Sequence, residues 1–250
     1  MSLLSKIKKN KDAKVNEAKD SLGGFSLRDT DVYPMIIEAA FMGEAASGAG
    51  SVTLHLKDKE GKGTYRETFY VTGRDGNHFY VRDNENYPLM GFTMIDDICL
   101  LVTGEGLLDL DEDSIEEKVV KLWDADAKAE KNTNVEMITS LVGEEILVAI
   151  EKQIIDKTAK GDDNKYHPTG ETREINAAVK VFHAEERMTV LEAKAESEEA
   201  VFIDKWLDKN KGTVINKAKG AGEGKTAGKA SSPQKAKKSL FSNKNKAGDE

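Results

Sequence analysis

The 250-residue sequence predicts a mainly β fold with flanking helices, an α+β protein. Two patterns predict this class. Apolar and polar residues alternate in several segments between residues 33 and 182, which is typical of strands with one buried face. An apolar repeat at helical spacing interrupts them between Phe92 and Val102. Hydrophobic residues make up 38% of the chain and charged residues 33%, so we expect one folded domain with unfolded ends.

Composition divides the chain into three segments. Residues 1–24 alternate Lys with small polar residues, which predicts a flexible basic arm. Residues 213–250 are rich in Gly, Ala and Lys and hold one aromatic residue, which predicts a disordered tail. The folded domain is expected over residues 25–212. From Lys211 onward the chain has ten Lys and three acidic residues, whereas the residues before it include 27 basic and 42 acidic ones. The tail is therefore basic and the body acidic.

Four consecutive strands are predicted in the first part of the domain. Each shows apolar residues at every second position, and the polar segments 58–63 and 73–77 are typical of turns between neighbouring strands. We therefore expect all four strands in one sheet. They cover residues 33–42, 51–57, 64–72 and 77–82.

One helix and further strands follow. Thr93, with Asp96 three residues later, indicates the start of the helix, and Gly104 indicates its end. Strands are expected over residues 118–123, 145–155 and 173–182, and a strand at 135–141 stays open. Two short helices close the domain, one started by Thr189 and the other ended by Gly212.

This element order is that of an OB-fold, a five-stranded barrel that binds oligonucleotides on one sheet face and in two loops. Here an extra hairpin and the C-terminal helices would be added to the barrel. The two loops would be residues 45–50 and the long arm 158–172.

Basic and aromatic residues concentrate between Ser51 and Arg82. These 32 residues hold five of the sixteen aromatic residues, and six Lys or Arg against four acidic residues. If the outward positions share one surface, cations for phosphates lie beside rings on which bases stack, each stack being worth roughly 1–3 kcal/mol. A solvated sheet surface without a ligand would show a similar pattern, because Tyr is a common strand residue. The candidate binding residues are His55, Lys57, Arg66, Tyr70, Arg74, Tyr80 and Arg82.

Two other places add candidates. Tyr166 in the segment 158–172 and the flanking residues Lys157 and Arg173 again place a ring among cations, although an ordinary polar hairpin would look the same. Trp123 ends a predicted strand and fits either packing or base stacking.

The sequence contains no complete catalytic or metal-binding motif of a familiar enzyme class. Cys99 is the only cysteine, and with four scattered histidines it cannot form a zinc site at standard spacing. The aspartates at 109, 111 and 113 resemble a calcium loop, but Ser114 and Val120 stand where Gly and Glu are required. No nucleotide-binding or nucleophile motif is complete. We therefore expect no catalytic activity, no metal and no cofactor.

Several separated blocks resemble the single-stranded DNA-binding proteins encoded by tailed bacteriophages. The blocks are ETFYVTGRDG, GFTMIDDICLLVTG, YHPTGETREIN, KVFHAEER and FIDKWLDKNKG, followed by a tail with KKSLF. The resemblance spans about residues 25–212 and the tail. It implies an OB-fold core that coats single strands during phage replication and recombination. Many such proteins end in a long acidic tail, and this tail is basic until its last residues, so recruitment of a polymerase by the tail is in doubt.

The expected function is non-sequence-specific binding of single-stranded DNA in the host cell cytoplasm. The sequence does not decide whether replication or recombination proteins, or a second copy of the chain, are further partners. No run of eighteen apolar residues and no signal peptide is present in the sequence, so we expect no membrane association. Two alternatives stay open: a recombination mediator or annealing protein, and a structural or scaffolding protein of the virion.

Overall fold

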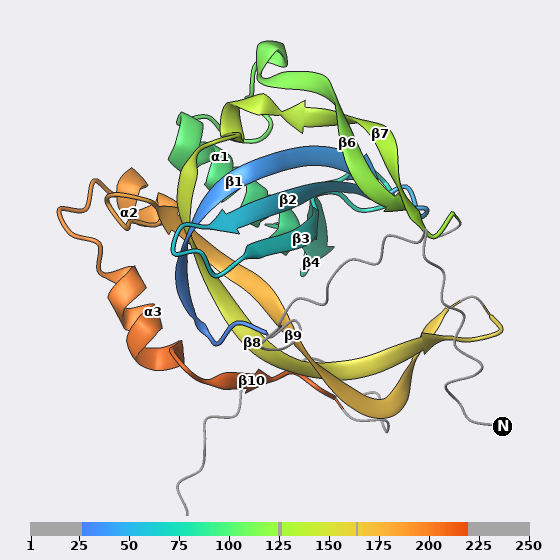
Figure 1. Ribbon diagram of the computed structural model, residues 1–250. Helices are drawn as coiled ribbons and strands as arrows, with labels where there is room; N and C mark the ends of the chain where they lie inside the picture. Colours follow the sequence, from blue (N-terminus) through green and yellow to red (C-terminus); the bar gives the residue numbers. More distant parts are fainter. Residues whose placement is uncertain (1–26, 125–126, 164, 220–250) are drawn as a thin grey trace, which may run out of the picture.

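A computed structural model describes residues 27–124, 127–163 and 165–219 of the chain (Figure 1). The predicted basic arm, residues 1–24, and the part of the predicted tail after residue 219 lie outside these residues. The described part contains one eight-stranded sheet, a separate two-stranded hairpin and three α-helices, so the prediction of a mainly β fold with helices is confirmed. No helix in these ranges is both long and apolar enough to cross a bilayer.

The first three strands form an antiparallel meander with β2 at its centre. β2 pairs with β1 on one side and with β3 on the other. The other edge of β1 is shared: its first half pairs with β8, and Phe41 pairs with β7. A bulge between Ile37 and Ala39 lets β1 bend from one partner to the next. The bounds are Asp31–Glu44 for β1, Gly50–Asp58 for β2, Thr64–Tyr70 for β3, Ala129–Ile138 for β7 and Glu145–Lys160 for β8.

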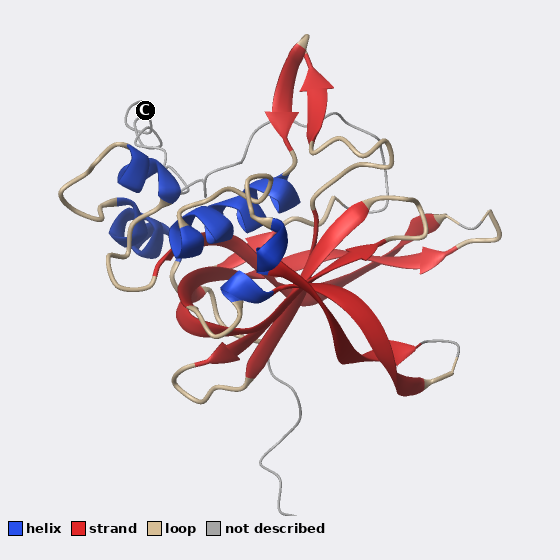
Figure 2. Cartoon of the chain, turned by 90° about the horizontal axis from the view of Figure 1, so that it is seen from above, coloured by secondary structure: helices blue, strands red, loops and turns tan. Residues whose placement is uncertain are grey.

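Two long hairpins extend from this sheet to the same side of the molecule in both views (Figures 1 and 2). One joins β6 (Ile115–Asp124) to β7, and the other joins β8 to β9 (Tyr166–His183). The segment 135–141, for which the sequence leaves a strand undecided, forms the end of β7 and a 3-10 turn, Thr139–Leu141. The expected loop 158–172 is mostly strand, because β8 and β9 stay paired as far as Lys160 and Tyr166.

The predicted barrel is not closed by strand pairing. Within the described residues β3 pairs only with β2, and β9 only with β8. A side chain bridges the gap: the Glu67 carboxylate on β3 accepts a hydrogen bond of 2.8 Å from the backbone N–H of Ala178 on β9. The same carboxylate accepts a hydrogen bond from the Tyr65 hydroxyl. Burial raises the pKa of Glu67 despite these two donors.

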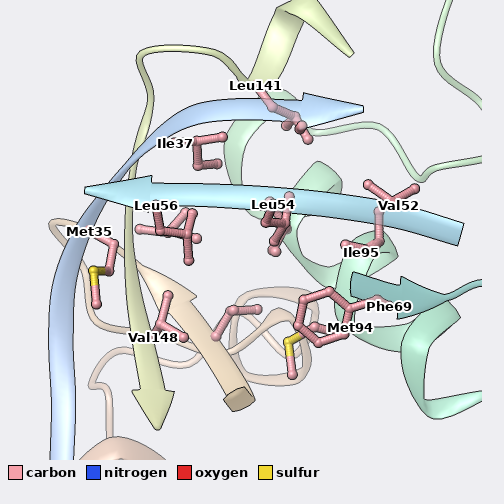
Figure 3. Packing of buried hydrophobic residues seen from close by; sticks show 14 of the residues in the cluster. Met35, Ile37, Val52, Leu54, Leu56, Phe69, Met94, Ile95, Leu141 and Val148 are labelled. Carbon is pink, nitrogen blue, oxygen red and sulfur yellow. The ribbon is translucent and has the colours of Figure 1, made fainter. Parts of the chain in front are cut away.

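The main core lies between the inner face of the sheet and helix α1 (Met90–Thr103) (Figure 3). Leu54 and Leu56 of β2 meet Met35 and Ile37 of β1, as their alternation predicts, and Ile95 packs from the helix. Gly104 ends the helix with φ 82°, a conformation in which glycine has no Cβ penalty. The predicted start at Thr93 is wrong by one turn. The helix begins at Met90, and the Asp96 side chain accepts from the N–H of Leu107 instead of capping the helix.

The fourth predicted strand does not join the main sheet. β4 (Phe79–Arg82) pairs with β5 (Glu85–Pro88) as a separate hairpin, which stands out from the body in Figure 2. The turn at Asp83 and Asn84 has positive φ at both residues, 53° and 63°, which matches the twist of a two-residue hairpin. The alternation predicts Val81 on the core side, but Val81 is 65% exposed, because β4 pairs with β5 and leaves the main sheet.

The C-terminal elements cover one end of the sheet. Helix α2 (Val190–Lys194) begins with the predicted capping box of Thr189 and Glu192, and α3 (Phe202–Asn210) packs Trp206 against Phe182 and Ala149. The expected domain boundary at residue 212 is too early. Val214–Asn216 forms β10, which pairs in parallel with β8 at residues 152–154.

Candidate nucleic-acid interface

The outward face of β2 and β3 carries most of the predicted binding residues. His55 lies directly opposite Arg66, and Thr53 lies opposite Thr68 with 2.8 Å between their hydroxyl oxygens. Tyr70 ends β3 on the same face and is 54% exposed. Because the strand period is two, Lys57 shares this face at the other end of β2. We call Thr53, Lys57, Arg66, Thr68 and Tyr70 the β2–β3 face.

His55 is part of the packing and does not supply charge to this face. Its ring meets the edge of Phe41 at 5.2 Å and 85°, and its Nε2 atom is buried with no hydrogen-bond partner among the described residues. Burial lowers the pKa of His55, and the Arg66 guanidinium lowers it further. Both effects favour the uncharged imidazole, so we do not count His55 among the cations of this face.

The cations of this face are not neutralised by nearby acids. In the described part of the chain neither Lys57 nor Arg66 forms an ion pair. Two other predicted cations differ: Arg82 lies 3.4 Å from the Asp83 carboxylate, and Lys157 lies 2.8 Å from Glu171. An unpaired cation can meet a phosphate without first losing a protein partner. Lys57 and Arg66 are therefore the better placed phosphate ligands.

The start of α1 fixes the backbone at Tyr70. A Cβ atom on Gly91 would lie 2.2 Å from the carbonyl oxygen of Tyr70, so only glycine allows this approach. On the other side, the N–H of Val71 donates to the carbonyl of Gly50 at 2.9 Å. The end of β3 is thus held between a helix and a neighbouring strand, while the Tyr70 ring stays in solvent.

A cleft runs along the free edge of β3. It has a volume of about 720 Å³ and separates the start of β3 from β9. Arg66 reaches it from the β2–β3 face, so the face and the cleft are continuous. The walls include Arg28, Lys62, Tyr65, Arg66, Glu174 and Asn176.

The remaining predicted rings and cations lie on the two long hairpins. Trp123 is 64% exposed and points away from Val120 and Leu122, which pack on Phe41. Tyr166 is 70% exposed near the tip of the β8–β9 hairpin. Arg173 is opposite Ile155, so it shares a face with Ile175, which lines the cleft. In Figure 1 the two hairpins extend on either side of strands β2 and β3.

Comparison with known proteins does not assign the chain to a family. No family model matches the chain. No curated protein matches it either. The candidate interface therefore depends on its own geometry.

The structure separates three predicted residues from the β2–β3 face. Tyr80 and Arg82 belong to the β4–β5 hairpin, where Tyr80 stacks on Tyr87 with ring centres 5.7 Å apart. Arg74 lies in the turn after β3, and its carbonyl oxygen approaches Gly48 in the β1–β2 turn. The prediction of one continuous surface including Tyr80 and Arg82 is wrong, because β4 leaves the sheet.

Sequence reasoning missed the cleft and the threonine pair. Thr53 and Thr68 occupy outward positions of two predicted strands, so the alternation could have identified them. Arg28 and Lys62 could not have been found this way, because they reach the cleft from a segment before β1 and from a turn. Among the residues that the structure describes, no cluster of His, Cys, Asp or Glu is arranged to hold a metal ion.

Proposed function

We propose that the protein binds single-stranded DNA without sequence specificity, using the β2–β3 face and the adjoining cleft. The observation that carries the proposal is the combination of two unpaired cations, Lys57 and Arg66, with the exposed Tyr70 ring on one sheet surface. This surface belongs to a chain with a net charge of -8, so its local cations are set against an acidic background. Cations that follow a backbone beside rings that accept bases are the usual means of binding single strands.

We further propose that the sheet is an OB-fold variant that opens between β3 and β9. Support comes from the bent β1 shared by β2, β8 and β7, and from the helix that follows the first meander. In an OB-fold two loops border the binding face. Here the β6–β7 and β8–β9 hairpins would take that place, with Trp123 and Tyr166 as additional stacking rings.

In the proposed mechanism, phosphates contact Lys57 and Arg66 while one base stacks on Tyr70. Only an unpaired base presents a free face to a protein ring, and this requirement favours single strands over duplexes. Phosphate contacts supply affinity without reading sequence. The threonine pair lies between the cations and Tyr70 and can donate hydrogen bonds to phosphate or sugar oxygens.

Photocrosslinking tests the location of the site. An oligo-dT strand carrying 5-iododeoxyuridine forms covalent adducts with aromatic side chains that it contacts, and mass spectrometry locates them. We expect a major adduct on Tyr70 that persists in Tyr70→Phe, which keeps the ring, and disappears in Tyr70→Ala. Tyr87→Ala is the matched control and should leave the adduct unchanged. Adducts confined to Tyr80, Tyr87 or Phe202 would overturn the proposed site.

A further inference from the structure

Strand β4 has one edge that no described strand covers. The N–H of Leu89 donates to the carbonyl of His78 at 2.9 Å, and a two-residue turn joins Arg82 to Glu85. Hydrogen-bonded pairs alternate along an antiparallel ladder, so Tyr80 and Arg82 direct their backbone groups toward β5. Phe79 and Val81 therefore direct theirs outward, away from β5.

The corresponding edge of β5 is incomplete. Asn86 and Pro88 are its outward residues by the same alternation, and Pro88 has no N–H to donate. β4 thus offers two donors and two acceptors at regular spacing, and β5 does not. An isolated two-stranded hairpin is only marginally stable in water, so the hairpin would gain from a further strand on β4.

The side chains of the hairpin favour a protein partner over a nucleic acid. Val81 is 65% exposed and Tyr80 48% exposed. The only cation, Arg82, already contacts the Asp83 carboxylate, and the nearby Glu85 carboxylate accepts a hydrogen bond of 2.6 Å from the Tyr87 hydroxyl. Asp83 and Glu85 together outweigh Arg82, so phosphates would be repelled.

We propose that β4 pairs in antiparallel fashion with β4 of a second copy of this chain, centred on Tyr80. The pattern is self-complementary. Phe79 of each copy lies opposite Val81 of the other, and all four outward backbone groups of each strand find partners. Tyr80 then lies opposite Tyr80 of the second copy. The observed Tyr80–Tyr87 stack continues into a row of four rings across four strands.

The contact is small, and its size determines when it forms. Two strands of four residues bury far less than the roughly 1,200 Å² at which stable interfaces begin. We expect weak association in solution and stronger association when two copies are held next to each other. This last part rests on the proposed function, because a shared single strand would hold the copies together.

Engineered disulfides test the register. In the proposed pairing the two Tyr80 residues form a non-hydrogen-bonded pair with Cα atoms about 4.5 Å apart. This separation lies within the range of about 4.4–6.8 Å that a disulfide spans. The two Val81 residues are displaced along the strands and lie beyond that range. Cys99 does not interfere, because it is buried and burial raises the pKa of its thiol to about 12.

We expect Tyr80→Cys to form disulfide-linked dimers at least tenfold faster than Val81→Cys under mild oxidation. Val81 is the more exposed of the two, so random collisions would favour Val81→Cys. Equal rates, or a faster reaction of Val81→Cys, would overturn the pairing. Binding of an unrelated extended peptide to β4 in preference to a second copy of β4 would also overturn it.

A second arm separates this inference from the proposed function. Long oligo-dT should accelerate the Tyr80→Cys crosslink, and an oligo-dT that holds only one copy should not. A fast crosslink with no acceleration on long oligo-dT would support the β4 contact and count against single-strand binding. Normal oligo-dT binding with no preference for Tyr80→Cys would count against the β4 contact alone.

Discussion

Replacing Asp58 with Ala should lower the free energy of unfolding by roughly 3–5 kcal/mol, as expected when one partner of a buried ion pair is removed. The Asp58 side chain is fully buried and pairs with the Arg28 guanidinium, which is only 10% exposed. Without Asp58 the Arg28 charge would remain buried beside the Tyr33 ring, 5.0 Å from its centre, with no carboxylate to balance it.

Arg28 also explains why the loss should be large. Its backbone N–H donates to the Asn176 side chain at 2.8 Å, and its guanidinium donates to the carbonyl of Lys62 at 3.1 Å. The residue therefore ties the β2–β3 turn to β9 across the open side of the sheet.

Urea denaturation of the full chain measures this effect. Glu145→Ala is the matched control, since Glu145 pairs with Lys59 at the surface, where an ion pair is worth about 0–1 kcal/mol. A loss for Asp58→Ala no greater than that for Glu145→Ala would show that the buried pair does not hold this part of the fold.

The double variant Arg66→Ala with Tyr70→Ala should lose most of the affinity for oligo-dT. Loss of one stacked base costs roughly 1–3 kcal/mol, which is about 5- to 150-fold in the dissociation constant. Loss of one phosphate contact should also reduce the slope of log affinity against log salt by about 0.7. Neither side chain is needed for the core, because both are exposed. Fluorescence anisotropy with labelled oligo-dT measures both quantities.

The control for the double variant is Arg187→Ala with Tyr87→Ala, which removes the same residue types elsewhere. Arg187 pairs with Asp204 near the C-terminal helices, and Tyr87 lies on the separate hairpin. The control should bind like the unmodified chain. Similar losses in both double variants would indicate general electrostatics in place of a site on the β2–β3 face.

Local patterns in the sequence predicted the elements better than their partners. The alternation in β2 and β3 placed Leu54 and Leu56 inside and Arg66 and Tyr70 outside, because strand periodicity is a local property. The capping box at Thr189 and the stop at Gly104 are local in the same way. The failure at β4 is different. Its alternation predicts Val81 inside, but the two-residue turn that follows pairs β4 with β5 outside the main sheet and leaves Val81 exposed.

The contacts that hold the candidate site together join residues far apart in the chain. Glu67 reaches Ala178, and Arg28 reaches Asn176, across the gap between β3 and β9. A single sequence does not identify such pairs. A charged residue at an inward position, such as Glu67, indicates only that some buried partner is needed, without naming it. For the same reason, the neutralised cations Arg82 and Lys157 could not be distinguished from the unpaired Lys57 and Arg66.

The central claim is that an unpaired base stacks on the β2–β3 face, and competition between oligo-dT and a duplex of equal length, at equal salt, tests it most directly. The account predicts a clear preference for oligo-dT that persists as salt rises, because stacking is not screened, while duplex binding through phosphates alone falls away. Equal affinity for the two ligands across the salt series would contradict it.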